Sequence, residues 1–245
     1  ASYHDMYYMN PPAKDLSKIA SSDKVKKVQK DFEATHVRPQ RLMKTLFTDE
    51  AYVKANVDEA RLMRRLFDLA CNMQSHDTDM QLYSLFTDEE CYDLWSCNNL
   101  YWYLTHACSP VTDGLMPYRE ADLLRNILDR ADAALKEGKN QATLRFGHES
   151  CLLPLVALLE LNHYGESYPD VEKLSEQWRA YDIFPMASNV QFVFFHKKGS
   201  NDVLVKVLLN EKEAKLPVKT DVAPYYHWKD VESYYREKLD KYQHI

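Results

Sequence analysis

Glycine is scarce in this sequence, with 5 glycines among 245 residues, whereas soluble proteins use about 7%. The two glycine-rich loops that bind phosphate through backbone amides are absent, because neither G-x-G-x-x-G nor G-x-x-x-x-G-K-[ST] occurs. These absences exclude the dinucleotide-binding and P-loop classes. A bound phosphate would have to be held by a different device.

Long apolar runs and an excess of basic charge are also lacking. The longest apolar stretch, Cys151 to Leu161, is too short to cross a bilayer, which takes about 20 residues. The net charge is −6, so the sequence predicts neither a membrane span nor a nucleic-acid partner. No charged and apolar leader follows Ala1. We therefore expect a signal peptide to be absent or removed, and an upstream segment to precede this chain.

Cysteine is sparse and unpatterned. The five cysteines form no C-x-x-C pair, which disfavours a structural zinc site, and we expect buried thiols. Hydrophobic residues at 45% and charged residues at 28% are typical of a soluble globular protein, and the length allows one large domain or two small ones.

Helical periodicity dominates the first 140 residues, which we expect to form a mostly helical cap subdomain. Apolar residues recur at helical spacing in five segments: 22–34, a short one from Pro39, one from Asp58, one from Thr87 to about Leu104, and one from Tyr118 to Gly138. The third segment places Leu62, Leu66 and Leu69 on its apolar face. The fourth begins with a capping box formed by Thr87 and Glu90.

The pattern changes after Gln141, and residues 141–245 are expected to be the second part of an α/β core domain. Residues 142–146 predict a short strand, and a helix is predicted from Glu149 to Leu161. The β-rich runs SNVQFVFFHKK and DVLVKVLLNEK are separated by GSN, which predicts a hairpin. A helix from about Trp228 to Lys241 closes the chain.

The turn between the predicted strand and helix carries Gly147, His148 and Glu149. Groups at such a turn converge where open α/β sheets bind ligands. Gly147 permits a sharp turn or a close approach to a ligand, and the first helical amides attract an anion. His148 adds a donor, and a protonated Glu149 can act as a general acid on a leaving oxygen. A purely structural histidine and a glutamate that offsets the helix dipole remain the alternative.

Several ordered blocks mark a resemblance to a known family. The run LRFGHESCLLPLVALLELN resembles the second conserved block of the histidine acid phosphatases, and in particular of their multiple inositol-polyphosphate phosphatase branch. The runs FPMASNVQFVFFHKK and VKVLLNEKEAKLP are similar to later strands of that branch, and WKDVESYYREKL resembles its closing helix. The resemblance implies an α/β fold of the phosphoglycerate-mutase-like (histidine phosphatase) kind. This chain would carry the helical cap and the later part of the core sheet.

The resemblance assigns catalytic roles to two residues. His148 matches the histidine that binds the substrate phosphate, and Glu149 stands where the broader family has the acid that protonates the leaving group. In the inositol-polyphosphate branch the acid follows one position later, where this sequence has Ser150. The resemblance implies hydrolysis of phosphate monoesters, with inositol polyphosphates such as phytate as the leading substrates.

The nucleophilic histidine of the family, in the block R-H-G-x-R-x-P, has no counterpart in residues 1–245. The resemblance therefore implies a carboxyl-terminal part that is inactive alone and needs an upstream portion of the same protein to supply the nucleophile. It also implies no metal or organic cofactor and a periplasmic or secreted location. The alternative is a non-catalytic module that binds phosphate or a partner.

Overall fold

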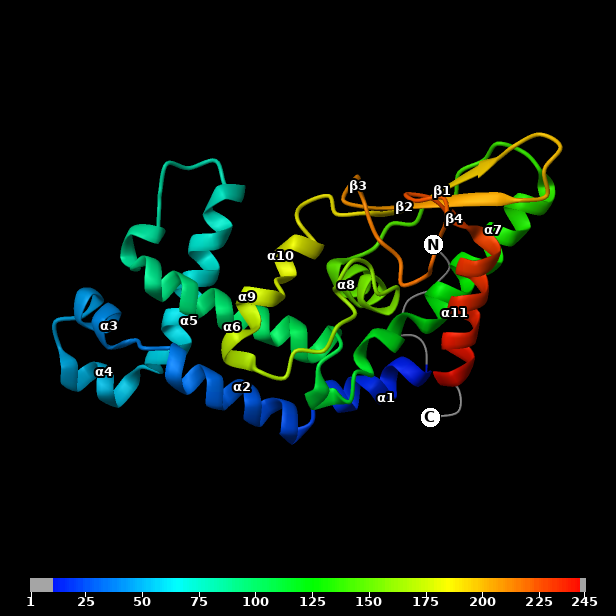
Figure 1. The fold of residues 1–245 in the computed structure, drawn as a ribbon. Coiled ribbons are helices and arrows are strands. Elements are labelled where there is room, and N and C mark those ends of the chain that lie inside the picture. The colour runs from blue at the N-terminus through cyan, green and yellow to red at the C-terminus, as the bar shows by residue number, and fades with distance from the viewer. Residues whose placement is uncertain (1–10, 243–245) are drawn as a thin grey trace. The chain divides into compact units, whose positions relative to one another are not determined.

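The computed structural model describes residues 11–242 (Figure 1), and the chain divides into two compact units. One unit is Lys26–Tyr101, and the other combines Ala1–Val25 with Trp102–Ile245. Both boundaries fall inside helices, α2 (Asp23–His36) and α6 (Asp88–His106). The predicted division at residue 140 separates a helical cap from an α/β core. The two compact units do not test it, and it stays a prediction.

The unit of residues 26–101 is built from helices, and local signals set their starts. Besides parts of α2 and α6 it contains α3 (Gln40–Leu46), α4 (Glu50–Asn56), α5 (Glu59–Asn72) and the 3-10 turns η3 (Met73–Ser75) and η4 (Tyr83–Leu85). Pro39 precedes α3 as its N-cap, as predicted. The carboxylate of Asp58 accepts the amide of Arg61 at 3.1 Å, which caps α5 at the predicted residue.

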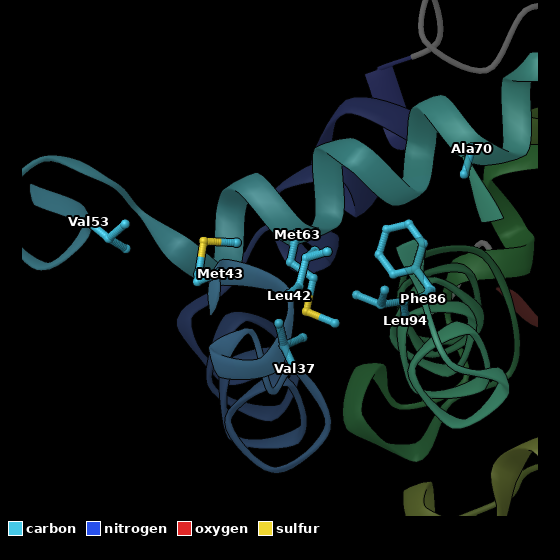
Figure 2. Close-up of a cluster of buried hydrophobic side chains, with 8 residues drawn as sticks. All are labelled: Val37, Leu42, Met43, Val53, Met63, Ala70, Phe86 and Leu94. Carbon is cyan, nitrogen blue, oxygen red and sulfur yellow. The ribbon is translucent and has the colours of Figure 1, made fainter. Parts of the chain in front are cut away.

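The core of this unit is a cluster of eight buried side chains: Val37, Leu42, Met43, Val53, Met63, Ala70, Phe86 and Leu94 (Figure 2). The predicted inner face of α5 was wrong by about one residue. Met63 and Ala70 are buried, whereas Leu69 is 52% exposed, and Leu62 and Leu66 only flank the cluster. The apolar stripe is wide enough to allow either orientation, so the packing partners decide the rotation of the helix.

The predicted capping box at the start of α6 is confirmed. The Thr87 amide donates to the Glu90 carboxylate at 3.0 Å, and the Glu90 amide donates to the Thr87 hydroxyl at 3.2 Å. Arg41 of α3 donates to both oxygens of the same carboxylate, at 2.8 and 2.5 Å, and lowers the pKa of Glu90. One acid thus caps its own helix and holds a second helix of the unit.

The other unit carries the remaining helices: α1 (Pro11–Ala20), η5 (Pro110–Thr112), η6 (Met116–Glu120), α7 (Ala121–Glu137), α8 (Glu149–Leu158), η7 (Val171–Lys173), α9 (Leu174–Gln177), α10 (Ala180–Ile183) and α11 (Trp228–Tyr242). The predicted helix from Tyr118 starts as the 3-10 turn η6 and continues as α7. It ends at Gly138, whose φ of 63° gives the left-handed C-cap that favours glycine. No helix within residues 11–242 is long and apolar enough for a membrane span.

The predicted hairpin is confirmed. Strands β1 (Val190–His196) and β2 (Val203–Leu209) pair antiparallel along their whole length. The short strands β3 (Lys212–Glu213) and β4 (Tyr226–His227) both pair with the opposite edge of β2. Among the described residues β1 therefore has one edge without a partner.

Helix α11 covers one face of this sheet (Figure 1). Val205 and Val207 of β2 are fully buried, and the Phe194 ring of β1 meets the Trp228 ring edge-on at 4.9 Å. The Trp228 indole also donates to Asp132 of α7 at 2.9 Å. The closing helix is thus fixed to both the hairpin and α7.

The strand predicted at residues 142–146 was wrong for this chain. Residues 140–148 form neither helix nor strand. Leu144 is 76% exposed and Phe146 is 86% exposed, although the alternation of this segment is that of a strand. A strand exists only as part of a ladder, and no other described segment pairs with this one.

Candidate functional site

His148 is the N-cap residue of α8. Its φ of −112° and ψ of 162° are extended, and its side chain does not cap the helix. The His148 carbonyl accepts the amides of Cys151 at 3.0 Å and Leu152 at 3.1 Å. The imidazole is exposed, so within the described structure it is available to a ligand and does not hold the turn together.

Glu149 and Ser150 begin α8, as the sequence predicted for the helix start. Cys151 is the first residue of this turn whose amide finds an acceptor, the His148 carbonyl. The amides of Glu149 and Ser150 precede it and keep free N–H groups at the positive end of the helix. The Glu149 side chain is exposed and Ser150 is half-buried. Two amides and one imidazole at a helix start can hold an anion, with a carboxyl group on the adjacent residue.

The rest of α8 is an anchor for this turn. All six residues from Leu153 to Leu158 are buried, so the helix start has little freedom to move. Pro154 lies inside the helix, where its missing N–H leaves the Ser150 carbonyl without its helical donor. The helix ends at Leu158, three residues before the predicted Leu161.

Gly147 is not required by the turn itself. A Cβ at Gly147 would meet no atom within 4 Å, and its φ is not in the left-handed region. The sharp-turn argument for this glycine was therefore wrong. A close approach of a ligand to its backbone stays a prediction.

A buried acid lies behind the first turn of α8. Glu120, the last residue of η6, is 1% exposed, and neither of its carboxyl oxygens has a hydrogen-bond partner of normal geometry among the described residues. Burial raises the pKa of Glu120 to about 8, and the Arg119 charge and the nearby Cys151 thiol counteract only part of this effect. Glu120 is therefore a neutral acid at pH 7.

His106, at the end of α6, belongs to the same buried group. Burial lowers the pKa of His106 to about 3, and the Arg119 charge acts in the same direction. Arg119 donates to the Thr105 carbonyl at 3.1 Å, and the Thr105 hydroxyl lies 2.7 Å from Nδ1 of His106. The sequence analysis missed this group, because YREAD has the pattern of an exposed first helical turn and burial comes from packing of η6 on α8.

The cavity of about 520 Å³ in this unit lies at the opposite end of α8. Its lining includes Cys108, Tyr118, Glu160 and Lys238. Its lysine and glutamate are already engaged, since Lys238 pairs with Glu160 at 2.8 Å and donates to the Leu158 carbonyl at 2.6 Å. The His148 turn is separate from this cavity and forms an open surface.

The five cysteines were predicted to be buried thiols. All five are free thiols, as predicted, but each is half-buried and none is fully buried. Burial raises the pKa of Cys97 and Cys151 to about 12, so neither is a thiolate at neutral pH. Across residues 11–242 no three histidine, cysteine or acidic side chains are grouped to bind a metal ion.

The class of protein follows from a comparison of the sequence with known families. The sequence profile of the histidine phosphatase superfamily (branch 2) matches residues 4–210. The chain therefore belongs to this superfamily, and the predicted fold class is confirmed.

Particular relatives place the chain near one branch of that superfamily. Human multiple inositol polyphosphate phosphatase 1 is 28% identical over 134 residues, an alignment that covers 49% of this chain and 27% of the human protein. The multiple inositol polyphosphate phosphatase of Bifidobacterium longum, solved with phosphate, superposes with a TM-score of 0.63 at 19% identity over 95% of this chain and 57% of that one. Its complex with inositol hexasulfate gives a TM-score of 0.58 at 18% identity over 95% and 56%. The chain thus spans little more than half of its solved relatives and about a quarter of the human one.

Proposed function

We propose that this chain is the carboxyl-terminal part of a phosphatase that hydrolyses phosphate monoesters, with inositol polyphosphates as the leading substrates. Membership of the superfamily supports the reaction class, and the names of the relatives support the substrate class. The observation that carries the proposal is the exposed imidazole of His148 beside Glu149 at the start of α8.

In this proposal the turn grips the phosphoryl group. His148 and the first amides of α8 donate to the phosphoryl oxygens. The phosphoryl group passes to a histidine supplied by the upstream portion of the protein, while Glu149 gives its proton to the departing alcohol oxygen. Water then attacks the phosphohistidine and releases phosphate. Charge stabilisation comes from donors and cations of the protein, without a metal ion.

Two unpaired surfaces support the need for an upstream portion. The segment 140–148 leaves Leu144 and Phe146 exposed. Within residues 11–242, β1 has an open edge although both of its faces are rich in apolar residues. Strands that are apolar on both faces are usually central in a sheet, and open apolar edges are normally covered. We propose that the upstream portion covers these surfaces and brings the nucleophile to His148.

The substitution Glu149→Gln in the full-length protein tests the role of the acid. An alkyl phosphate such as an inositol phosphate has a poor leaving group, so its turnover should fall about 10²- to 10⁴-fold. Turnover of p-nitrophenyl phosphate should fall far less, because its phenolate hardly needs a proton. The matched control Glu137→Gln changes an exposed acid at the end of α7 and should change neither rate.

Equal losses on both substrates would show that Glu149 is a structural carboxylate. Ser150→Ala separates the two family patterns, since it should leave the leaving-group dependence unchanged if Glu149 is the donor. A periplasmic or secreted location is part of the same proposal, and fractionation of cells that express the full coding sequence checks it.

The second candidate function is a non-catalytic module that binds phosphate or a partner. It is favoured by the absence of R-H-G-x-R-x-P from residues 1–245. The coding sequence upstream of Ala1 decides between the two. That block upstream supports the enzyme, whereas a start codon directly before Ala1 supports the module.

A further inference from the structure

His227 of β4 lies between two carboxylates. Its Nδ1 is 3.0 Å from each oxygen of Asp202, and its Nε2 is 3.0 Å from Oδ1 of Asp221. Asp202 directly precedes β2, and Asp221 lies in the segment 216–225 that leads into β4. The ring therefore joins two stretches of chain that enter the sheet separately.

This geometry requires a doubly protonated ring. A carboxylate only accepts hydrogen bonds, and a neutral imidazole has a single N–H to donate. Hydrogen bonds from both ring nitrogens to carboxylates therefore exist only in the imidazolium form. The two acids raise the pKa of His227 above its ordinary 6.5, Asp202 first and then Asp221. The side chain is 30% exposed, so its proton exchanges with solvent.

Lys206 of β2 has partners other than the two acids. It pairs with Glu213 at 3.1 Å and lies over the Tyr225 ring. The ring and its two acids thus form a closed three-residue group.

Asp202 is more constrained than Asp221. Asp202 contacts the ring through both oxygens, and its amide donates to the Ser200 hydroxyl at 3.0 Å. Asp221 contacts the ring through one oxygen, and its side chain is 83% exposed. When the ring loses one proton, the Nδ1–H bond to Asp202 is the one retained, and Nε2 becomes an acceptor that repels Asp221.

We infer that His227, Asp202 and Asp221 form a proton-operated clasp, which fastens the part of segment 216–225 around Asp221 to the start of β2 when the imidazole is charged and releases it when the imidazole is neutral. Within the segment, the Thr220 hydroxyl donates to the Tyr225 carbonyl at 2.7 Å, and the Val222 amide donates to the Thr220 hydroxyl at 3.2 Å. These bonds shape the segment. Tyr225 at its end is held separately, by the Phe195 ring of β1 at 5.1 Å and by Lys206 of β2, so the clasp attaches the part of the segment around Asp221. The clasp is independent of the phosphatase proposal.

Ring titration by NMR and amide hydrogen exchange test the clasp on the full-length protein. From about pH 5 to about pH 9, the His227 ring should titrate with a midpoint above 6.5. Protection of the Val222 and Tyr225 amides, corrected for the intrinsic pH dependence of exchange, should be lost over the same interval. Asp221→Ala should lower the midpoint and remove the pH dependence of this protection.

His227→Gln should give the released state at every pH. The matched control is His196→Gln, because His196 on the same hairpin contacts the Ser200 carbonyl at 2.7 Å and no carboxylate. It should leave the behaviour of segment 216–225 unchanged. A His227 midpoint at or below 6.5, or protection that ignores the titration of the ring, would overturn the clasp. Far-UV circular dichroism shows that each variant is folded.

Discussion

Replacing Glu120 by glutamine should remove a loss of stability that develops as pH rises from about 4.5 to about 8. The folded chain keeps this acid neutral, because burial raises its pKa from 4.5 to about 8. The unfolded chain releases the same proton near pH 4.5. The folded state therefore binds more protons between these two values, and stability falls as pH rises through them. Glutamine has the same shape and cannot ionise, so Glu120→Gln removes this loss.

The size of this stability loss follows from the interval between the unfolded-state pKa of Glu120 and the pH of the measurement. One pH unit corresponds to about 1.4 kcal/mol for a single proton, so the interval from 4.5 to pH 7 corresponds to a loss of about 3 kcal/mol in the wild type. At 1% exposure solvent screening does not reduce this figure appreciably. Near pH 5 the loss is below about 1 kcal/mol, and the two proteins should be nearly equal in stability.

Urea denaturation at about pH 5, 6, 7 and 8 measures the difference at each pH. The difference between the two proteins at each pH cancels the contributions of titratable groups that both share, including His106. The free energy of unfolding of Glu120→Gln should exceed that of the wild type by an amount that grows by about 1.4 kcal/mol per pH unit. Parallel curves would refute the claim that Glu120 is buried and neutral.

Three further predictions concern packing and acid stability. Gly165→Ala should lower the free energy of unfolding by about 1–3 kcal/mol, because its Cβ would lie 2.5 Å from Cγ of Glu160 and 2.9 Å from its Cα; Gly147→Ala, with open space around it, should be neutral in the same urea titration. Leu42→Ala should cost about 2–5 kcal/mol, since Leu42 is fully buried in the cluster of residues 37–94, and thermal melts followed by circular dichroism measure it. His106 should lower the free energy of unfolding as pH drops from 6.5 towards 3, because the unfolded chain takes up a proton that the buried imidazole refuses; above about pH 4.5 the contribution of Glu120 has the opposite sign, so the test is the free energy of unfolding of His106→Gln minus that of the wild type, which should rise as pH falls, and a constant difference would contradict the assignment.

Helix ends were predictable where a local signal sets them. Asp58, the pair Thr87 and Glu90, and Gly138 each act through atoms within a few residues, and the structure has all of them in the predicted roles. The hairpin was predictable for the same reason, because a short polar turn separates two β-rich runs. The start of α8 at Glu149 was predicted equally well.

The predictions that failed concern features set by contacts between segments far apart in the sequence. Residues 142–146 have strand-like alternation but find no partner to complete a ladder. The inner face of α5 is centred on Met63, and only its neighbours could show that. The burial of Glu120 was not predicted at all, because it is set by packing of η6 against α8.

The candidate site was only partly predictable from residue patterns. Spacing placed His148 and Glu149 at a strand-to-helix turn, but the same spacing fits a structural histidine equally well. The family resemblance supplied the phosphatase interpretation, and the superfamily match confirms the family. The roles of His148 and Glu149 stay predictions, because residues 1–245 do not contain the block R-H-G-x-R-x-P.

A crystal structure of the full-length protein with inorganic phosphate tests the central claim most directly. The account predicts a phosphate at the start of α8, with the His148 ring and the amides of Glu149 and Ser150 within about 3 Å of its oxygens. It also predicts that a histidine from the upstream portion faces the phosphorus from the opposite side. Phosphate bound elsewhere, with the His148 ring covered by upstream residues, would contradict the account.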